Sequence, residues 1–308
     1  MKAIMYHYIS PKKIDLPHLH YLHLNDFVKQ LEYFGNEYGF ISYEEFQQCI
    51  LSNKPTKGVV LTFDDGFSDH YRYVLPELLK QGLWGIFYVS TSPFLTGKLI
   101  DVHRIHMLLG KYGESEIAHA LQRIITEDMI SHAHVIEFSK DTYVRQNNNV
   151  TTNYVKRLLN YFIDYKYRQG VLDELMSIYY PNEKDLVKDF YMTKAEIKHM
   201  HNNGMVIGSH TVNHPIMSKI SICEQEIEIE SSFQMIESIV GIPTLKTFCY
   251  PYGGYHSFTA GTEQLLEKNA CLFSFNVEAR DISEKDLASR RQALPRYDCN
   301  AFPYGSCR

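Results

Sequence analysis

The sequence predicts a parallel α/β fold in which strands alternate with helices. Short apolar runs rich in β-branched and aromatic residues recur along the 308 residues. Longer stretches with helical spacing of apolar residues separate these runs. One run, Gly58–Phe63, is continuously apolar, as in a strand that is buried on both faces. From these patterns alone, a barrel and an open sheet both remain possible.

The individual elements follow in that alternation. The expected strands are Ala3–Ile9, Gly58–Phe63, Trp84–Ser90, Met205–Ile207, Leu245–Cys249 and Leu272–Val277. The expected helices between them are Asn25–Tyr38, Phe67–Gln81 and a segment that ends at Gly241. Asn25 is the expected N-cap of the first helix, and Pro76 is expected to kink the second.

Residues 97–190 break this rhythm because they are polar and helix-rich. We expect them to form a helical insertion between two βα units, within a single domain that spans residues 1–308. The stretch Asp101–His106 opens the insertion. Its His103 and Arg104 are candidate contacts for a substrate phosphate or sugar, and a surface helix or an oligomer contact is an equally supported alternative. The sequence does not predict an oligomeric state.

The composition argues against some partners. The net charge is −5, which speaks against a nucleic-acid surface and offers no basic footprint for anionic membranes. No stretch approaches the roughly 20 apolar residues of a transmembrane helix, and the short apolar N-terminal run is interrupted by His7. We therefore expect a cytoplasmic protein. Its six scattered cysteines, which contain no CxxC pair, are expected to be reduced thiols.

Two polar motifs follow expected strands. Asp64 and Asp65 end the buried strand, and His210 and His214 follow a later one with i, i+4 spacing. Each motif has an ordinary explanation when taken alone, a capped turn for the aspartates and surface residues for the histidines. Because the carboxyl ends of parallel strands meet at one edge of a sheet, the motifs together predict a shared site.

One carboxylate and two imidazoles make an open three-ligand metal site, formed here by Asp65, His210 and His214. Asp64 is then placed to act as a base on a metal-activated water. The ligand set favours Zn²⁺, with Co²⁺, Ni²⁺ or Fe²⁺ as alternatives. The same ligands also serve non-haem Fe(II) oxygenases, which therefore remain an alternative class.

A third motif, Tyr250–Gly254, follows another expected strand. Its proline and paired glycines indicate a tight turn whose exposed backbone N–H groups suit an oxyanion hole, although a plain turn would explain the residues too. Tyr250 and Pro251 are candidate substrate contacts.

In this order the motifs resemble the polysaccharide deacetylases, a carbohydrate esterase family with a metal-dependent distorted (β/α) barrel. The residues that carry the resemblance are Thr62-Phe-Asp-Asp-Gly66, His210-Thr-Val-Asn-His214, Tyr250-Pro-Tyr-Gly253 and Leu294-Pro-Arg296. Phe63–Ser90 and Thr193–Gly254 resemble the family throughout, and the resemblance covers about two-thirds of the chain. It implies metal ligation by Asp65, His210 and His214, general-base catalysis by Asp64, and an oxyanion contact from the Tyr252 N–H.

The chain departs from the common family pattern at two places. Cys249 stands where the third motif usually carries an arginine, and the usual C-terminal histidine, the general acid, is absent. The branch that is similar to the poly-N-acetylglucosamine deacetylases carries instead a histidine in an N-terminal Tyr-His pair, and here His7 occupies that position. We expect His7 to be the general acid, with a buried structural histidine as the alternative, and Arg296 to supply the missing positive charge beside Asp64, with a surface ion pair as the alternative.

The expected reaction is hydrolysis of an N-acyl group, acetyl or formyl, from a sugar. A cytoplasmic location favours a glycan precursor or a short oligosaccharide over a finished polymer. A non-catalytic sugar-binding relic is the remaining alternative, since the missing arginine leaves Asp64 without its usual partner.

Overall fold

The computed structural model describes residues 1–11, 16–139, 142–143 and 148–307. They form two compact units. One comprises residues 1–11, 21–97 and 187–307, and the other residues 16–20 and the described part of 98–186. Among the described residues, no helix is long and apolar enough to cross a membrane.

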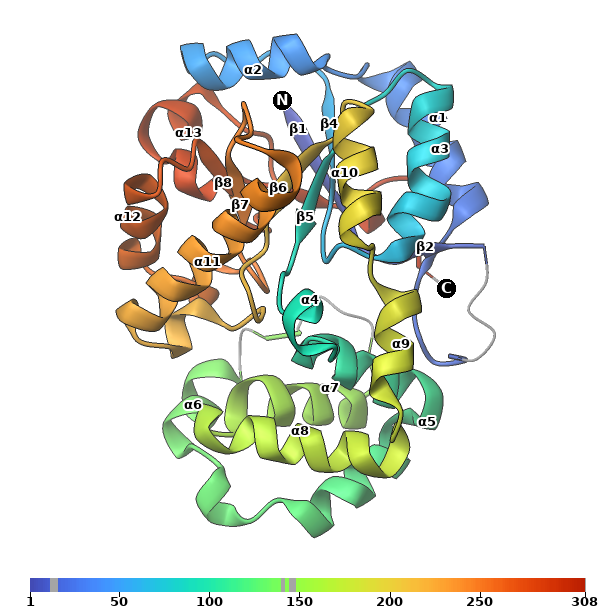
Figure 1. Ribbon diagram of the computed structural model, residues 1–308, viewed down its shortest axis with the longest axis vertical. Coiled ribbons are helices and arrows are strands. Elements are labelled where there is room, and N and C mark those ends of the chain that lie inside the picture. Colours follow the sequence, from blue (N-terminus) through green and yellow to red (C-terminus); the bar gives the residue numbers. More distant parts are fainter. Residues whose placement is uncertain (12–15, 140–141, 144–147, 308) are drawn as a thin grey trace. The chain divides into compact units, whose positions relative to one another are not determined.

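The first unit is built on a parallel sheet of seven strands in the order β8-β7-β6-β5-β4-β1-β9 (Figure 1). The strands are β1 Lys2–Tyr6, β4 Val59–Phe63, β5 Ile86–Val89, β6 Val206–Ser209, β7 Thr247–Cys249, β8 Phe273–Phe275 and β9 Tyr297–Asp298. This curled sheet confirms the predicted α/β class and the distorted barrel. The expected first strand, Ala3–Ile9, is in fact divided: β1 ends at Tyr6, and β2 (Ile9–Ser10) pairs separately with β3 (Leu22–His23).

The segment Leu294–Asp298 links the two edges of the sheet. Leu294 donates its N–H to Ser274 O and accepts from Asn276 N, which binds it to the β8 edge. Three residues later, β9 pairs in parallel with β1, Tyr297 lying opposite Ile4. The segment thus bridges β8 and β1, and Arg296 lies between its two attachment points.

Alternating side chains divide the core into an outer and an inner layer. Ile4, Leu61 and Phe63 pack outward in a cluster with residues of the flanking helices, Leu31 of α1 among them. Val60 and the other strand residues whose side chains point to the opposite face pack in a second cluster, inside the curve of the sheet. The helices of this unit are α1 Leu24–Glu37, α2 Tyr43–Ser52, α3 Leu75–Lys80, α4 Pro93–Thr96, α10 Lys194–Asn202, α11 Ile222–Val240, α12 Ala260–Lys268 and α13 Glu284–Ser289.

Two predicted helices begin differently from expectation. His23, not Asn25, caps α1, because its Nδ1 accepts the Asn25 N–H at 3.2 Å. In the expected helix Phe67–Gln81, a π-helical turn at His70–Val74 precedes α3. Pro76 lies in the first turn of α3, directly after this π-helical turn, so the helix departs from regular α geometry just before the proline.

The second unit is helical, as the composition of the insertion indicated. It contains α5 Asp101–Ile124, α6 His132–Phe138, α7 Val150–Arg157 and α8 Tyr165–Tyr179, and α9 Glu183–Phe190 begins in it and ends in the first unit. Gly113 interrupts the regular backbone of α5 with a positive φ of 77°, a conformation that favours glycine. The unit includes residues 16–20, which the sequence pattern did not assign to it.

Candidate active site

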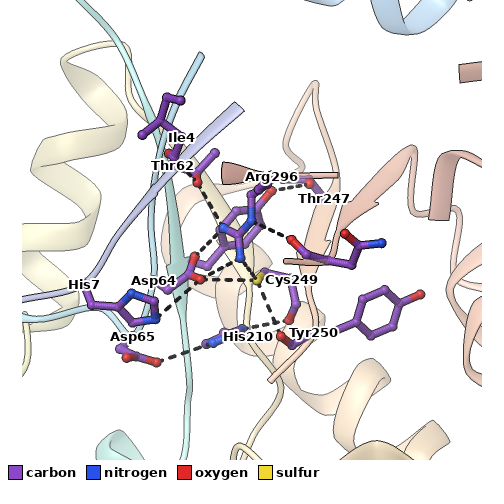
Figure 2. A network of polar contacts seen from close by, with 12 residues as sticks. Ile4, His7, Thr62, Asp64, Asp65, His210, Thr247, Cys249, Tyr250 and Arg296 are labelled. Atoms are coloured by element: carbon purple, nitrogen blue, oxygen red, sulfur yellow. Dashed lines mark hydrogen bonds and ion pairs between the residues drawn. The ribbon is translucent and has the colours of Figure 1, made fainter. Parts of the chain in front are cut away.

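The motif residues converge at the carboxyl ends of neighbouring strands. Asp64 and Asp65 follow β4, His210 follows β6, and Cys249 is the last residue of β7. The ladder places β4, β5, β6 and β7 side by side. Figure 2 shows the side chains of these residues directed toward one another.

Asp65, His210 and His214 form a buried cluster whose ligand atoms all lie within 4.8 Å of one another. Asp65 Oδ1 is 3.4 Å from His210 Nε2 and 3.6 Å from His214 Nε2. The Nδ1–H of His210 donates to Cys249 O at 2.7 Å, which leaves the lone pair of a neutral ring on Nε2, facing the carboxylate. Two imidazoles and a carboxylate in this arrangement fit a divalent metal ion.

The loops that carry the ligands adopt unusual backbone conformations. Asp65, Thr211, His214 and Tyr252 all have positive φ, between 57° and 78°, and none is a glycine. Such residues cost about 1–3 kcal/mol each and persist only where surrounding contacts hold them. Half of the eight positive-φ non-glycine residues in the described chain therefore belong to this site.

Glu228 of α11 holds the loop between the two histidines. Its Oε2 accepts the backbone N–H groups of Val212 and Asn213, each at 2.8 Å, and its Oε1 accepts from Asn213 Nδ2. Within the loop, Thr211 Oγ1 accepts the His214 N–H at 2.9 Å. Glu228 is buried, so this charged clamp acts where water does not compete. The sequence motifs did not predict a role for Glu228, although this glutamate lies beside the apolar face of a predicted helix.

Asp64 forms a bidentate ion pair with Arg296. The Oδ1 and Oδ2 atoms each accept from one guanidinium nitrogen at 2.8 Å (Figure 2). Arg296 also donates to Thr62 Oγ1 at 3.0 Å and to Asn276 O at 3.1 Å. It also contacts Cys249 Sγ, at 2.9 Å. The guanidinium thus stands beside the cysteine that occupies the usual arginine position.

Burial and charge act in opposite directions on Asp64. Burial alone raises the pKa of its carboxyl group, but the charge and hydrogen bonds of Arg296 outweigh that effect and lower the pKa to about 2. The carboxylate is therefore ionised at neutral pH. Burial also raises the pKa of the Cys249 thiol, so the neighbouring sulfur is neutral and adds no negative charge.

His7 lies at the rim of this network. Its Nε2 is 3.9 Å from Asp64 Oδ2, and its side chain is 41% exposed. The alternative interpretation, a buried structural histidine whose ring bonds a backbone carbonyl, does not describe this ring. That description fits His70, which is buried and donates from Nε2 to the His7 carbonyl oxygen at 2.7 Å.

The third motif divides into two parts. The Tyr252 ring lies 5.1 Å from the His214 ring, which places this residue next to the ligand set. The sequence suggested Tyr250 as a substrate contact, but its side chain faces the core. Its buried ring stacks on Phe258 at 3.8 Å, its hydroxyl donates to Gln292 O, and in Figure 2 the ring points away from Asp64 and Asp65. Pro251 is also buried.

His103 and Arg104 are buried inside the helical unit, 0% and 1% exposed. The Arg104 guanidinium donates to both oxygens of Glu183 at 2.8 Å and lies 2.9 Å from Asp173 Oδ1. The prediction that Arg104 meets a substrate phosphate is therefore wrong, because acidic side chains of the same unit already hold its charge. A surface helix does not describe these two residues either.

Comparison with known proteins agrees with this fold and site. Residues 150–269 match the family model described as Polysaccharide deacetylase. No curated protein sequence gives a significant match. Similar solved structures include the Streptococcus pyogenes deacetylase PplD in complex with acetate, with 18% identity, a TM-score of 0.57, and coverage of 97% of this chain and 91% of that one.

Two further structures share the fold. IcaB from Ammonifex degensii has 16% identity and a TM-score of 0.54, and the alignment covers 96% of this chain and 90% of that one. A de-N-acetylase from Aggregatibacter actinomycetemcomitans has 14% identity and a TM-score of 0.54, with coverage of 96% and 93%.

Fold and site define a hydrolase with a buried Asp-His-His metal centre at the carboxyl ends of a curled parallel sheet. The matched family model spans the histidine motif and the Tyr-Pro-Tyr-Gly turn, and Asp64 and Asp65 complete the set from outside it. Residues 150–269 are similar to the polysaccharide deacetylase family, the family that the motifs indicated. The class of the protein is therefore that of a carbohydrate deacetylase acting on a linear amide, and the oxygenase and sugar-binding alternatives are set aside.

Proposed function

We propose that this chain removes an N-acetyl group from an amino sugar by hydrolysis, with N-formyl as the second acyl group to test. One observation carries the proposal. The buried ligands Asp65, His210 and His214 lie beside a carboxylate, Asp64, that Arg296 keeps ionised and oriented. Amide hydrolysis needs an activated water and a base next to it, and this arrangement supplies the residues for both.

The proposed metal is Zn²⁺, held by Asp65, His210 and His214. When bound, it supplies Lewis-acid activation of a water molecule and of the acyl carbonyl. Asp64 takes the proton of the attacking water. Because both of its oxygens face Arg296, the carboxylate keeps one orientation throughout that transfer.

Two further groups complete the proposed mechanism. The Tyr252 N–H stabilises the developing oxyanion, and the positive φ of this residue, 63°, sets the turn that carries it. His7 protonates the departing amine, which is a poor leaving group without a proton. The support for His7 is its half-exposed ring at the rim of the site, 3.9 Å from Asp64.

The proposed substrate class is a glycan precursor, either nucleotide-linked or lipid-linked, or a short oligosaccharide. This choice goes with the cytoplasmic location expected from the sequence, which we retain as part of the proposal.

An amine-release assay tests the function directly. The metal-stripped protein, reconstituted with Zn²⁺, Co²⁺, Ni²⁺ or Fe²⁺, is offered N-acetyl and N-formyl sugar nucleotides and short N-acetylated oligosaccharides. Release of acetate together with a free amine, dependent on metal, supports the proposal. Substituting His210 and His214 together by alanine removes both metal and activity, while His199→Ala, an exposed histidine on α10, changes neither. Full metal occupancy in the double variant would show that the assigned ligands are wrong.

A further inference from the structure

The chain folds back on itself after β9. A short turn begins at Cys299, and the chain comes back into contact with this residue at Gly305. The Cys299 thiol lies 3.8 Å from Gly305 O, and the Gly305 N–H donates to Phe302 O at 3.1 Å. A Cβ atom on Gly305 would stand 1.8 Å from Cys299 O. Only glycine permits this approach, so the loop is a built feature of the fold.

Gln30 of α1 fixes this loop to the sheet. Its Nε2 donates to Cys299 O and to Pro303 O, each at 2.9 Å. Its Oε1 accepts from the Tyr6 hydroxyl at 2.7 Å, and Tyr6 is the last residue of β1. Gln30 and Tyr6 are both fully buried, so the loop has one position relative to β1 and α1.

This fold-back brings two thiols together. Cys307 lies two residues beyond Gly305, which is packed against Cys299, so the fold-back places the two thiols close enough for each to shift the pKa of the other. The two thiols differ in access, because Cys299 is 5% exposed and Cys307 is exposed. Their proximity raises the pKa of the Cys299 thiol and lowers the pKa of the Cys307 thiol. An exposed thiol of lowered pKa beside a buried second thiol is the arrangement found in redox-active pairs.

We propose that Cys299 and Cys307 are a reversible redox pair, which a low-molecular-weight disulfide such as glutathione disulfide converts to an intramolecular disulfide. The Cys307 thiolate attacks one sulfur of the small disulfide, whose S–S bond breaks and releases one thiol. The Cys299 sulfur, having lost its proton to solvent, then attacks the Cys307 sulfur of the mixed disulfide and releases the second thiol. Two protein thiols are oxidised, and one disulfide is reduced to two thiols.

The bond would act on a segment that matters to the site. The Cys299–Cys307 loop directly follows β9, and β9 directly follows Arg296. A covalent ring held by Gln30 limits the fraying of the chain beyond β9. Oxidation therefore stabilises the docked position of the strand that brings Arg296 to Asp64.

The test incubates the whole protein in glutathione buffers of increasing oxidised fraction, followed by mass analysis of the intact chain and of its peptides. The expected product has lost two hydrogen atoms and yields a peptide that links Cys299 to Cys307, reversible by dithiothreitol. In Cys299→Ser, the reaction stops at a glutathione adduct on Cys307. Cys223→Ser, which removes the other exposed thiol, leaves the product unchanged.

A second readout is hydrogen exchange at residues 297–307, which is expected to slow on oxidation of the wild type and to remain unchanged in Cys307→Ser. The proposal is overturned if the wild type stops at the glutathione adduct, if the cross-link joins two chains, or if oxidation leaves exchange in this segment unaltered.

Discussion

Arg296 lies 232 residues beyond Asp64, yet its guanidinium bonds both carboxylate oxygens of that residue at 2.8 Å. The pair is buried on both sides. Its position explains how the chain keeps a positive charge beside the Asp64 carboxylate although Cys249 stands at the usual arginine position. The charge comes from the segment Leu294–Asp298, which links the sheet edges, and not from the end of β7.

Arg296→Met is expected to lower the free energy of unfolding by about 3–5 kcal/mol, because it leaves the buried Asp64 carboxylate without its partner. Adding Asp64→Asn to this variant should restore part of the loss, since the uncompensated charge is then gone. Urea unfolding of the four proteins measures the coupling. Arg290→Met, which breaks a half-exposed pair with Glu263, is the control and should cost less than about 1 kcal/mol. Strict additivity of the two buried substitutions would contradict the pairing.

Asp64 and Asp65 should separate in their effects. Asp64→Asn is expected to keep the metal and to lower kcat by about 10²–10⁴-fold, the usual contribution of a general base. Asp65→Asn is expected to weaken metal binding, because one of the three ligands loses its charge. Metal analysis and kcat, measured on the same preparations, distinguish the roles. Equal metal loss in both variants would refute this division.

His7→Ala is expected to bind metal and to fold like the wild type but to lose most of the turnover. If His7 donates the proton to the leaving amine, the variant also loses the decline in rate at alkaline pH that deprotonation of an acid produces. The measurement is a pH–rate profile of kcat beside the unfolding curve. An unchanged profile would exclude His7 from the mechanism.

Glu228→Gln is expected to weaken metal affinity by about 10–100-fold, the range typical of groups that orient metal ligands. The substitution removes the negative charge that holds the N–H groups of Val212 and Asn213. The loss in free energy of Zn²⁺ binding should exceed the loss in free energy of unfolding of the metal-free protein. Glu230→Gln, two residues along the same helix, is the matched control. A loss of stability with unchanged affinity would reduce Glu228 to a scaffold residue.

His70 should make stability dependent on pH. Burial lowers its pKa to about 4 in the folded protein, whereas an unperturbed histidine titrates near 6.5. Below about pH 6.5 this histidine binds a proton in the unfolded chain but stays neutral in the folded protein. The free energy of unfolding is therefore at its full value above that pH and declines toward about pH 4, by roughly 3 kcal/mol in total. Urea unfolding at about pH 7.5 and about pH 5 measures the slope. His70→Gln, whose amide can still donate to the His7 carbonyl, should flatten it, and parallel curves would contradict this role.

Much of the centre could be predicted because its residues end strands. Strand ends of a parallel sheet converge, so Asp65, His210 and His214 could be grouped from sequence order alone. Arg296 could be proposed as the partner of Asp64 only because Cys249 stands at the usual arginine position and another cation was needed. The adjoining strand β9 has two residues and therefore no periodicity that would place Arg296.

Other features depend on tertiary contacts that local patterns do not record. Arg104 looks like a solvent-facing cation in the sequence, but acidic residues far along the chain enclose it. Tyr250 stands in the motif yet faces the core, because alternate side chains leaving β7 point to opposite sides. Glu228 binds the loop between the two histidines directly from α11, although it lies 15 residues beyond Asn213 in the sequence, and no local pattern records this contact.

The link between sheet closure and Arg296 has a consequence for the order of folding. Until Leu294–Asp298 docks between β8 and β1, Asp64 has no counter-charge and cannot be buried at low cost. The inner core around Asp64 must therefore form together with one of the longest-range contacts in the chain. Long loop closure slows such a step, so the chain should acquire its metal-site geometry late, after the local helices and neighbouring strands have formed.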